Sequence, residues 1–380
     1  MFGGRIIMTE ITVGDFIHQF EQYAPVKFAV PGDPVGLHFG SRKQVIHRMM
    51  VTLDVRPEVV DEAIEKNIDF IFAHHPPIFK APDKLDADDQ QQAMYIKLIK
   101  NNIAVYAAHT NLDAAPGGMN DWLADLYQIN DIEVLSPHTH VSYYRVNAYI
   151  PTESVASIHQ ELIAAGYGKF GNYSGVYYEL NGQGHFTPES GANPTIGAVN
   201  IDETVEETLY SLLCREDEWQ ACVDLITEKH PYEEPVIDVV QLANLNQPIG
   251  IGRIGNLKDP MPIEDYIQLI KDKTGVNGLR AVLADDKRLV KRVAVLGGDG
   301  GKYYPEALAK GADTFITGDI YYHVGHDMIA DGLNAIDPGH HFESICKSKL
   351  TQLFSDWQEA NEWQMTIMPS ELNTDPFTFY

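Results

Sequence analysis

Residues 45–73, VIHRMMVTLDVRPEVVDEAIEKNIDFIFA, contain the pattern that decides the fold class. VIHRMMVTLDV is rich in β-branched residues, as strands are, and RPEVVDEAIEKN has helical spacing with a proline near its start. DFIFA then forms a second short apolar run. A strand, a helix and a strand in this order are typical of a crossover unit in a parallel sheet, so we expect an α/β protein.

The same alternation extends in both directions along the chain. Toward the N-terminus, residues 9–23 predict an amphipathic helix, and a Gly/Pro-rich turn follows at residues 31–40. After residue 73 we expect further helices and strands at residues 91–102, 103–108 and 117–127, and a second alternating series from 292 to 369. These segments form one α/β architecture or two similar ones.

The middle of the chain has a different texture. We expect a strand at residues 143–151, a helix at 155–166, a turn-rich stretch at 171–197 and a second helix at 205–215. HPYEEP, residues 230–235, is interpreted as a fixed turn into an edge strand. The pattern predicts a compact α+β module inserted into a discontinuous α/β domain. The predicted boundaries are 1–137 and 251–380 for the α/β domain and 138–250 for the insert.

Composition bounds the class of protein and its partners. Hydrophobic residues make up 44% of the 380 and charged residues 22%, as in ordinary globular proteins. No apolar run approaches the roughly 18 residues that cross a bilayer, and residues 1–11 are too short and polar for a signal peptide, so we expect a cytoplasmic protein without a membrane partner. The three cysteines form no CxxC pair and are expected to be buried small hydrophobic residues.

The formal net charge of −26 argues against duplex nucleic acid as a partner, because like charges repel. An anionic small molecule fits only if a cleft holds a cation, which a bound metal would supply.

Polar or glycine-rich residues follow the predicted strands at one end. Ligands bind outside the carboxyl ends of the strands in open α/β sheets, because the crossover loops converge there. The segments that follow strands are His74-His75, HTNLD (109–113), GGDGG (297–301), Gly318-Asp319 and residues 338–341. We therefore expect these segments to meet at a functional site.

Imidazole and carboxylate together are natural ligands of divalent Zn, Fe or Mn. The candidate metal ligands are His74, His75, Asp113, His340 and Glu343. Five ligands suit a pair of ions roughly 3.5–4 Å apart with open positions for water, so two divalent ions are the preferred count. Asp113 has two oxygens with which to bridge them, and the spacing of His340 and Glu343 places both side chains on one helical face.

Each candidate also has a structural interpretation. A single histidine in an α/β core is usually just hydrogen-bonded, and only the whole set favours a metal site. His341 competes with His340 for the ligand role. His323 and His326 are partners or proton carriers near the site, or residues of an exposed helix face; His323 and Glu343 are the candidate catalytic groups.

GGDGGK, residues 297–302, resembles a phosphate loop but fails its pattern, because Tyr303 stands where serine or threonine is required. We expect a tight turn beside the metal site instead.

Several motifs in this order resemble the NGG-interacting-factor-three-like family, also called GTP cyclohydrolase 1 type 2 homologues. They are AHHPPIF (73–79), AAHTNLDAAPGGMND (107–121), GGDGGKYYPEALAKGAD (297–313), TGDIYYHVGHD (317–327) and DPGHHFES (337–344). The middle, with HPYEEP and the turn-rich stretch, is similar to the CutA-like (PII-like) module that interrupts longer bacterial members. The main fold would resume at QPIGIGRIGNL, residues 247–257.

The resemblance implies a two-metal site in an α/β domain, an inserted ferredoxin-like CutA/PII-like domain, and assembly into a homohexameric ring. The family's paired histidines fall on His74 and His75, its aspartate on Asp113, and its later histidine and glutamate on His340 and Glu343. Some members carry that glutamate four residues after the histidine, whereas Glu343 follows His340 by three. Either the loop is shorter here or the pair uses a different histidine.

The family name implies hydrolytic opening of a guanine nucleotide. We accordingly expect a metal-dependent hydrolase that acts on a nucleotide-like or phosphorylated small molecule, with a water activated by two divalent ions. The alternative is a non-catalytic regulatory or scaffold protein that binds the same metals and senses a ligand through the insert.

Overall fold

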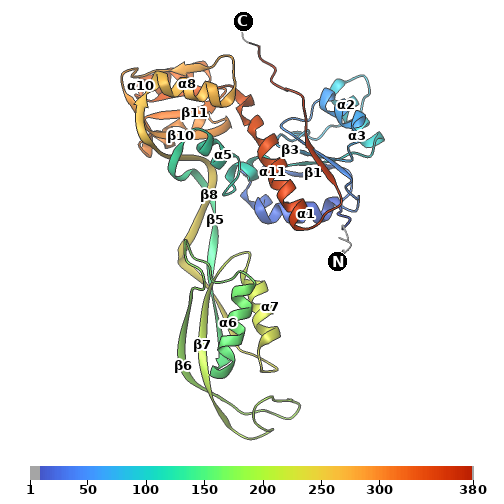
Figure 1. Cartoon of the computed structure of the whole chain (residues 1–380), viewed down its shortest axis with the longest axis vertical. Coiled ribbons are helices and arrows are strands. Elements are labelled where there is room, and N and C mark those ends of the chain that lie inside the picture. The colour runs from blue at the N-terminus through green and yellow to red at the C-terminus, as the bar shows by residue number, and fades with distance from the viewer. Residues whose placement is uncertain (1–8, 379–380) are drawn as a thin grey trace, which may run out of the picture. The chain divides into compact units, whose positions relative to one another are not determined.

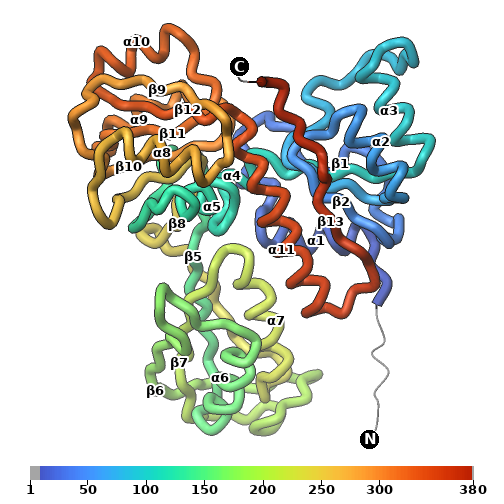
Figure 2. The backbone as a smooth tube through the Cα atoms, turned by 45° about the horizontal axis from the view of Figure 1, so that its top comes forward, coloured from blue at the N-terminus to red at the C-terminus, as the bar shows by residue number. Residues whose placement is uncertain are grey.

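A computed structural model describes residues 9–378, so residues 1–8, part of the segment weighed as a signal peptide, lie outside the described residues. The chain divides into two compact units (Figures 1 and 2). Unit 1 consists of Met1–Thr139 with Ile249–Tyr380, and unit 2 of His140–Pro248. Two long strands, β5 (Ile129–Pro151) and β8 (Ile237–Pro262), run through the boundaries.

The first sheet of unit 1 has the strand order β1-β4-β3-β2-β13. Its strands are β1 (Gly36–Phe39), β2 (Arg48–Thr52), β3 (Phe70–Ala73), β4 (Ala104–Ala107) and β13 (Thr366–Pro369). β13, β2, β3 and β4 are parallel, and β1 pairs antiparallel with β4 at the edge. The prediction of a turn throughout residues 31–40 was wrong, because the GLHF segment bonds to this sheet edge as β1.

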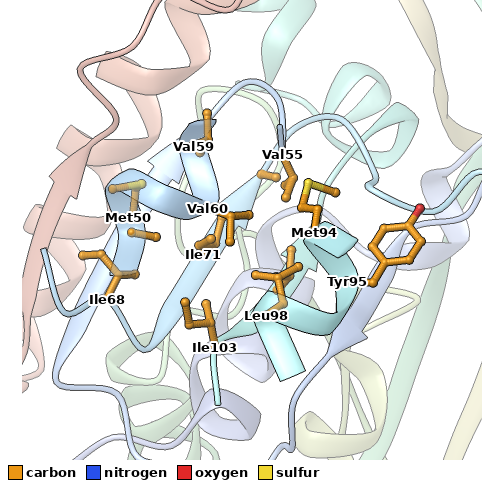
Figure 3. Packing of buried hydrophobic residues seen from close by; sticks show 13 residues of the cluster. Met50, Val55, Val59, Val60, Ile68, Ile71, Met94, Tyr95, Leu98 and Ile103 are labelled. Atoms are coloured by element: carbon orange, nitrogen blue, oxygen red, sulfur yellow. The ribbon is translucent and has the colours of Figure 1, made fainter. Parts of the chain in front are cut away.

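Both faces of this sheet are buried by helices, as expected for parallel strands. The helices are α1 (Val13–Tyr23), α2 (Pro57–Glu65), α3 (Gln90–Lys100) and α11 (Ile345–Ala360). Ile71 points toward α2 and α3, where it packs with Val60 and Leu98 (Figure 3). Phe72, its neighbour in β3, points to the opposite face and meets Phe354 of α11 with ring centroids 4.8 Å apart.

The second sheet of unit 1 has the strand order β8-β10-β11-β12-β9. β10, β11 and β12 are parallel, while β8 and β9 pair antiparallel at either side. Its elements are α8 (Ile263–Thr274), β9 (Arg280–Val282), β10 (Leu289–Asp299), α9 (Tyr304–Ala309), β11 (Thr314–Gly318), α10 (Tyr322–Ala330) and β12 (Asn334–Asp337). The short helices α4 (Thr110–Ala114) and α5 (Met119–Leu126) precede β5.

The two sheets of unit 1 repeat the same local construction. Asp69, before β3, accepts a hydrogen bond from the backbone N–H of Arg48 in β2, and Asp313, before β11, accepts one from the N–H of Arg292 in β10. Each arginine also donates through Nε, at 2.8 Å, to the carbonyl of the lysine that follows the intervening helix. Of the two possibilities left open above, the structure therefore shows two similar halves.

Unit 2 is a mixed α/β module with the strand order β6-β7-β5-β8. Its other elements are α6 (Val155–Ala164), β6 (Tyr177–Phe186), β7 (Glu203–Arg215) and α7 (Trp219–Lys229). β7 pairs antiparallel with β5 on one side and with β6 on the other. Its core includes Val146, Ile158, Tyr210 and Ile226.

The predicted second helix of the middle segment, residues 205–215, was wrong, because these residues form strand β7. Leucines at 209, 212 and 213 imitate helical spacing, but backbone pairing on both edges of β7 determines its conformation. The turn-rich stretch 171–197 likewise contains strand β6, and the second helix of the unit is α7.

One expectation from composition, buried cysteines, is confirmed. Cys214, Cys222 and Cys346 are free and buried. Among the described residues, no helix has the length and apolar character needed to span a membrane.

Candidate metal centre

Four of the five predicted ligands, His75, Asp113, His340 and Glu343, line one cavity of unit 1, of about 820 Å³, and the fifth, His74, is fully buried beside Asp113 and Glu343. His74 and His75 directly follow β3, and Asp113 lies in α4 after β4. His340 and Glu343 belong to a 3₁₀ turn, His340–Ser344, that follows β12 in the second sheet. The carboxyl ends of parallel strands in both sheets therefore supply this site, as the strand-end rule predicted.

Glu343 stands at the centre of the cluster. Its Oε2 lies 3.1 Å from His75 Nε2 and 3.3 Å from His340 Nε2, and its Oε1 lies 3.7 Å from His74 Nε2. Asp113 Oδ1 is 3.6 Å from the same His74 nitrogen. The carboxylate placed between the imidazoles is thus that of Glu343, and the bridging of two ions by Asp113 stays a prediction.

The histidine rings are held by their other nitrogen. His74 Nδ1 lies 2.7 Å from the Ala108 carbonyl oxygen, and His75 Nδ1 lies 2.7 Å from Asp54 Oδ1. His340 Nδ1 is 2.7 Å from Asp319 Oδ2 in the same manner. An acceptor at Nδ1 fixes the ring and directs Nε2 toward the carboxylates of the cluster, an arrangement typical of metal-binding histidines.

The donor set fits a divalent cation. His74 Nε2 and Asp113 Oδ1 are buried and have no hydrogen-bond partner among the described residues. Buried polar atoms are nearly always hydrogen-bonded, so such a pair requires an explanation, and a shared cation is one. Three groups of ligand atoms lie close enough together to hold an ion: His74-His75-His109, His75-His340-Glu343 and His74-Asp113-Glu343.

The charges in this cluster are strongly coupled. Burial raises the pKa of Asp113 to about 6. Burial acts in the same direction on Glu343, but the imidazoles of His340, His74 and His75 outweigh it and hold the pKa of that carboxyl well below its usual range. The site can therefore keep at least one carboxylate ionised in a buried position.

The two histidines that face Glu343 are shifted in the opposite direction. Burial lowers the pKa of His75, but hydrogen bonds to Asp54 and Glu343 outweigh it and raise that pKa to about 10. The pKa of His340 rises to about 9, since Glu343 and Asp319 overcome the effect of burial. A cation that binds to Nε2 must displace the proton held there, so metal binding here would release protons.

The positions of the other candidate histidines distinguish them from the proposed ligand His340. His340 Nε2 faces Glu343, whereas His341 lines the cavity but belongs to none of the three metal-binding groups found in the described chain. His323 and His326 lie on the exposed surface of α10, where their rings contact Tyr322. Neither is among the residues that line the cavity.

The glycine-rich segment 297–301, predicted to be a tight turn, begins inside the carboxyl end of β10 and lies beside the cluster. A Cβ at Gly297 would come within 2.5 Å of Glu343 Oε1. Gly298 has φ of +66° and lies against His340, so both positions suit glycine for different reasons. The backbone approaches the central carboxylate more closely than any side chain would allow.

Two groups at the site were missed by sequence reasoning. His109 joins His74 and His75 in one of the metal-binding groups, and its Nδ1 lies 2.8 Å from Asp33 Oδ1. Asp54 orients His75 and also accepts a hydrogen bond from Thr374. His109 and Asp54 each end or follow a predicted strand, so the strand-end rule could have identified both.

The rim of the cavity adds cationic side chains and phenyl rings to the histidines and carboxylates of the cluster. Arg56 and Lys302 line it, although the chain as a whole carries a formal charge of −26. Phe79 and Phe377 line it as well and are 64% and 65% exposed. Exposed rings beside cations offer both apolar contact and charge to a ligand that enters here.

The whole chain is similar to one protein family and its members. A family model described as Duf34/NIF3 (NGG1p interacting factor 3) matches residues 11–376. A Bacillus subtilis (strain 168) protein named "GTP cyclohydrolase 1 type 2 homolog" is 41% identical over 363 residues, which cover 96% of this chain and 97% of that protein.

Solved structures give the same result. The crystal structure of a Bacillus cereus protein related to NIF3 matches with a TM-score of 0.91 and 36% identity, over 97% of this chain and 99% of that one. A Staphylococcus aureus protein matches with a TM-score of 0.73 and 30% identity, over 97% and 99% of the two chains.

Proposed function

The chain belongs to the Duf34/NIF3 (NGG1p interacting factor 3) family, and from this premise and the geometry of the cavity we propose that it is a dinuclear metal-dependent hydrolase. Its proposed ligands are His74, His75, Asp113, His340 and Glu343, with Zn, Fe or Mn as the divalent ions. His109 is proposed as a further ligand on the His74-His75 side.

One observation carries this proposal. Nε2 atoms from both halves of unit 1 and the oxygens of two buried carboxylates converge, while the Nδ1 atoms of the histidines are held by fixed acceptors. Packing alone does not account for buried donor atoms that face one another unpaired, such as His74 Nε2 and Asp113 Oδ1. Overlapping groups of ligand atoms, with Glu343 in two of them, support two ions rather than one.

In the proposed reaction, the metal ions and the surrounding residues have separate roles. Bound divalent ions would supply a nucleophilic water of lowered pKa at neutral pH. Asp54 and Asp319 hold the rings of His75 and His340 in place, so that their Nε2 atoms stay directed into the cavity. Gly297, which has no Cβ, leaves room for the Glu343 carboxylate.

The rim of the cavity supports an anionic, ring-bearing substrate. Arg56 and Lys302 would attract a phosphate, and Phe79 and Phe377 would contact an aromatic or sugar ring. We therefore propose a nucleotide-like or phosphorylated small molecule, in line with the "GTP cyclohydrolase 1 type 2 homolog" name of the relatives.

A turnover screen tests the proposal. The purified chain, reconstituted separately with Mn²⁺, Fe²⁺ and Zn²⁺, is incubated with GTP, other nucleoside triphosphates and phosphomonoesters, and products are separated by chromatography. We expect turnover of at least one compound, its loss in Glu343→Gln, and its retention in His323→Ala, whose histidine is exposed on α10. No turnover with any compound and any metal would favour the non-catalytic alternative.

That alternative is a metal-binding regulatory protein in which unit 2 senses a ligand, and a cavity in unit 2 favours it. We propose that unit 2 is the CutA/PII-like domain. Along the chain its elements follow one another as β5-α6-β6-β7-α7-β8, which is the β-α-β-β-α-β pattern of ferredoxin-like modules. In the sheet its strands lie in the order β6-β7-β5-β8. Assembly into a homohexamer and a cytoplasmic location stay predictions; native mass spectrometry, with a chain mass of 42.5 kDa, tests the first.

A further inference from the structure

Unit 2 contains its own cavity, of about 710 Å³, which the metal centre does not explain. Strands β6 and β7 and the HPYEEP segment contribute to its walls, together with the loop that follows β6. We propose that this cavity binds a linear organic polyamine, with protonated nitrogens at its carboxylates and the hydrocarbon chain against its aromatic rings. This function is separate from the metal centre of unit 1.

The lining has the chemistry that recognises an organic cation. Four carboxylates line the cavity, those of Glu189, Glu207, Glu233 and Glu234. The rings of Tyr149, Phe186 and Tyr232 accompany them, and the imidazole of His185 lines the cavity as well. No lysine or arginine is among the lining residues in the described part of the chain. Aromatic faces attract ammonium groups, and several carboxylates along one cavity suit a ligand with several charges.

Glu207 is the least exposed of the four carboxylates. It is only 9% exposed and lines the cavity from β7. Its Oε1 accepts a hydrogen bond from the Tyr232 hydroxyl at 2.8 Å, whereas no hydrogen bond to Oε2 and no ion pair occur among the described residues. Oε2 keeps some exposure to solvent, so an incoming ammonium group can reach it and form a charge-assisted hydrogen bond.

The neighbouring histidine does not supply that positive charge. Burial lowers the pKa of His230, and both of its ring nitrogens are already used. Nδ1 accepts a hydrogen bond from the Tyr232 backbone N–H, and Nε2 donates to the Tyr149 carbonyl, each at 3.0 Å. Neutral His230 therefore fixes the HPYEEP turn, as interpreted from the sequence, and this turn places Tyr232 against Glu207.

The geometry favours an organic cation over a metal ion. All three groups of ligand atoms that could hold an ion in the described chain belong to unit 1. One of the four carboxylates is also partly engaged, since Glu233 Oε2 accepts a hydrogen bond from the Asn193 N–H at 2.9 Å. Carboxylates that do not converge on one point suit charges spread along a chain better than a single ion.

Gly184 makes room for the critical carboxylate. It lies in β6 across from β7, and a Cβ there would come within 2.3 Å of Glu207 Oε2. Alanine at this position would push the flexible end of the Glu207 side chain away without removing its charge. Gly184→Ala therefore tests the placement of the carboxylate, and Glu207→Gln tests its charge.

Isothermal titration calorimetry of spermidine into the full chain at physiological ionic strength provides the test. We expect saturable binding of one spermidine per chain, weakened at least about tenfold in Glu207→Gln, because a charge-assisted hydrogen bond is lost. Gly184→Ala should weaken binding as well. Glu153→Gln, which removes an exposed carboxylate of unit 2 outside the cavity, should bind as the unaltered chain does.

Three results would overturn the proposal. Equal weakening in Glu207→Gln and Glu153→Gln would show diffuse attraction to an acidic chain. Equal affinity for octanediol, which has a similar length and no charge, would show an apolar cavity only. Absence of saturable spermidine binding, with Glu207→Gln and the unaltered chain equally folded by circular dichroism, would show that the cavity takes no polyamine.

Discussion

At the scale of residues, the central feature is a buried carboxylate enclosed by imidazoles. Glu343 Oε2 and His75 Nε2 are 3.1 Å apart although 268 positions separate them in the chain. The residue types and their place after strands could be predicted from the sequence. Which carboxylate lies between the histidines could not, because it depends on how the second sheet packs against the first.

The choice between His340 and His341 shows the same limit. Both follow the Pro-Gly turn, so the sequence offers little to distinguish them. The conformation of the 3₁₀ turn decides the matter, since it directs His340 toward Asp319 and Glu343. By residue type alone, His323 was as good a candidate for the site, but in the structure it is exposed on α10.

The raised histidine pKa values give a prediction for the metal-free chain. His75 titrates near 6.5 when unfolded, and its pKa in the folded chain is about 10, so its stabilising contribution is complete below pH 6.5 and is lost as pH rises toward 10. His340, with a pKa of about 9, acts in the same direction. In the presence of a chelator, we expect the thermal unfolding midpoint to fall across this range.

The control is Asp54→Asn, which removes the charge of one partner of His75 and should reduce this dependence on pH. Added divalent metal should reverse it, because metal binding competes with protons and strengthens as pH rises. An unfolding midpoint of the chelated chain that rises from pH 6.5 to 10 would contradict this account.

At the scale of elements, period and order were predictable wherever a segment pairs with its sequence neighbours. Strands β2, β3 and β4 of unit 1, with the helices between them, follow this rule. Strand β7 does not, because the spacing of its leucines indicates a helix and only its pairing with β5 and β6 overrules that pattern. Strand pairing over long sequence distances is the information that a local pattern lacks.

The glycine-rich segment 297–301 offers a matched pair of variants. Alanine at Gly297 would place its Cβ within 2.5 Å of Glu343 Oε1, so we expect Gly297→Ala to shift this carboxylate and reduce the metal bound per chain. A Cβ at Gly301, four residues further along, would meet its nearest neighbouring atom at 3.6 Å. Gly301→Ala should therefore retain the metal. Metal content, measured by elemental analysis, would contradict the account if both variants behaved alike.

The aromatic face of the first sheet gives a prediction of stability. Phe72 is fully buried against rings from α1 and α11, so Phe72→Ala should lower the free energy of unfolding by about 3–5 kcal/mol. Phe79→Ala is the matched control, since its ring is 64% exposed and its loss should change stability by less than about 0.5 kcal/mol. Denaturant unfolding measures both, and equal losses would contradict the assigned packing.

At the scale of the whole molecule, the two similar halves of unit 1 explain why the candidate ligands occur near both ends of the sequence. Each half contributes the carboxyl ends of three parallel strands, and the cavity draws on both. The convergence of strand ends was predictable because it follows from the crossover topology. The cavity of unit 2 was not, since it depends on β6 and β7, whose strands the sequence pattern concealed.

The net charge of the whole chain limits how it can attract a substrate. With a formal charge of −26, the chain repels anions at long range, so an anionic substrate requires local positive charge. Arg56 and Lys302 supply part of it at the rim, and bound divalent ions would supply the rest within the cluster. The hydrolase proposal therefore depends on the metals both for chemistry and for attraction of the substrate.

The most direct test of the central claim is the number of metal ions per chain. Elemental analysis of the purified protein, reconstituted with divalent metal and freed of excess, should give close to two ions per chain. His74→Ala and Asp113→Ala should each lower that number sharply, while His323→Ala should not. Metal content that stays the same in all three variants, or a reconstituted chain that retains none, would contradict the site described here.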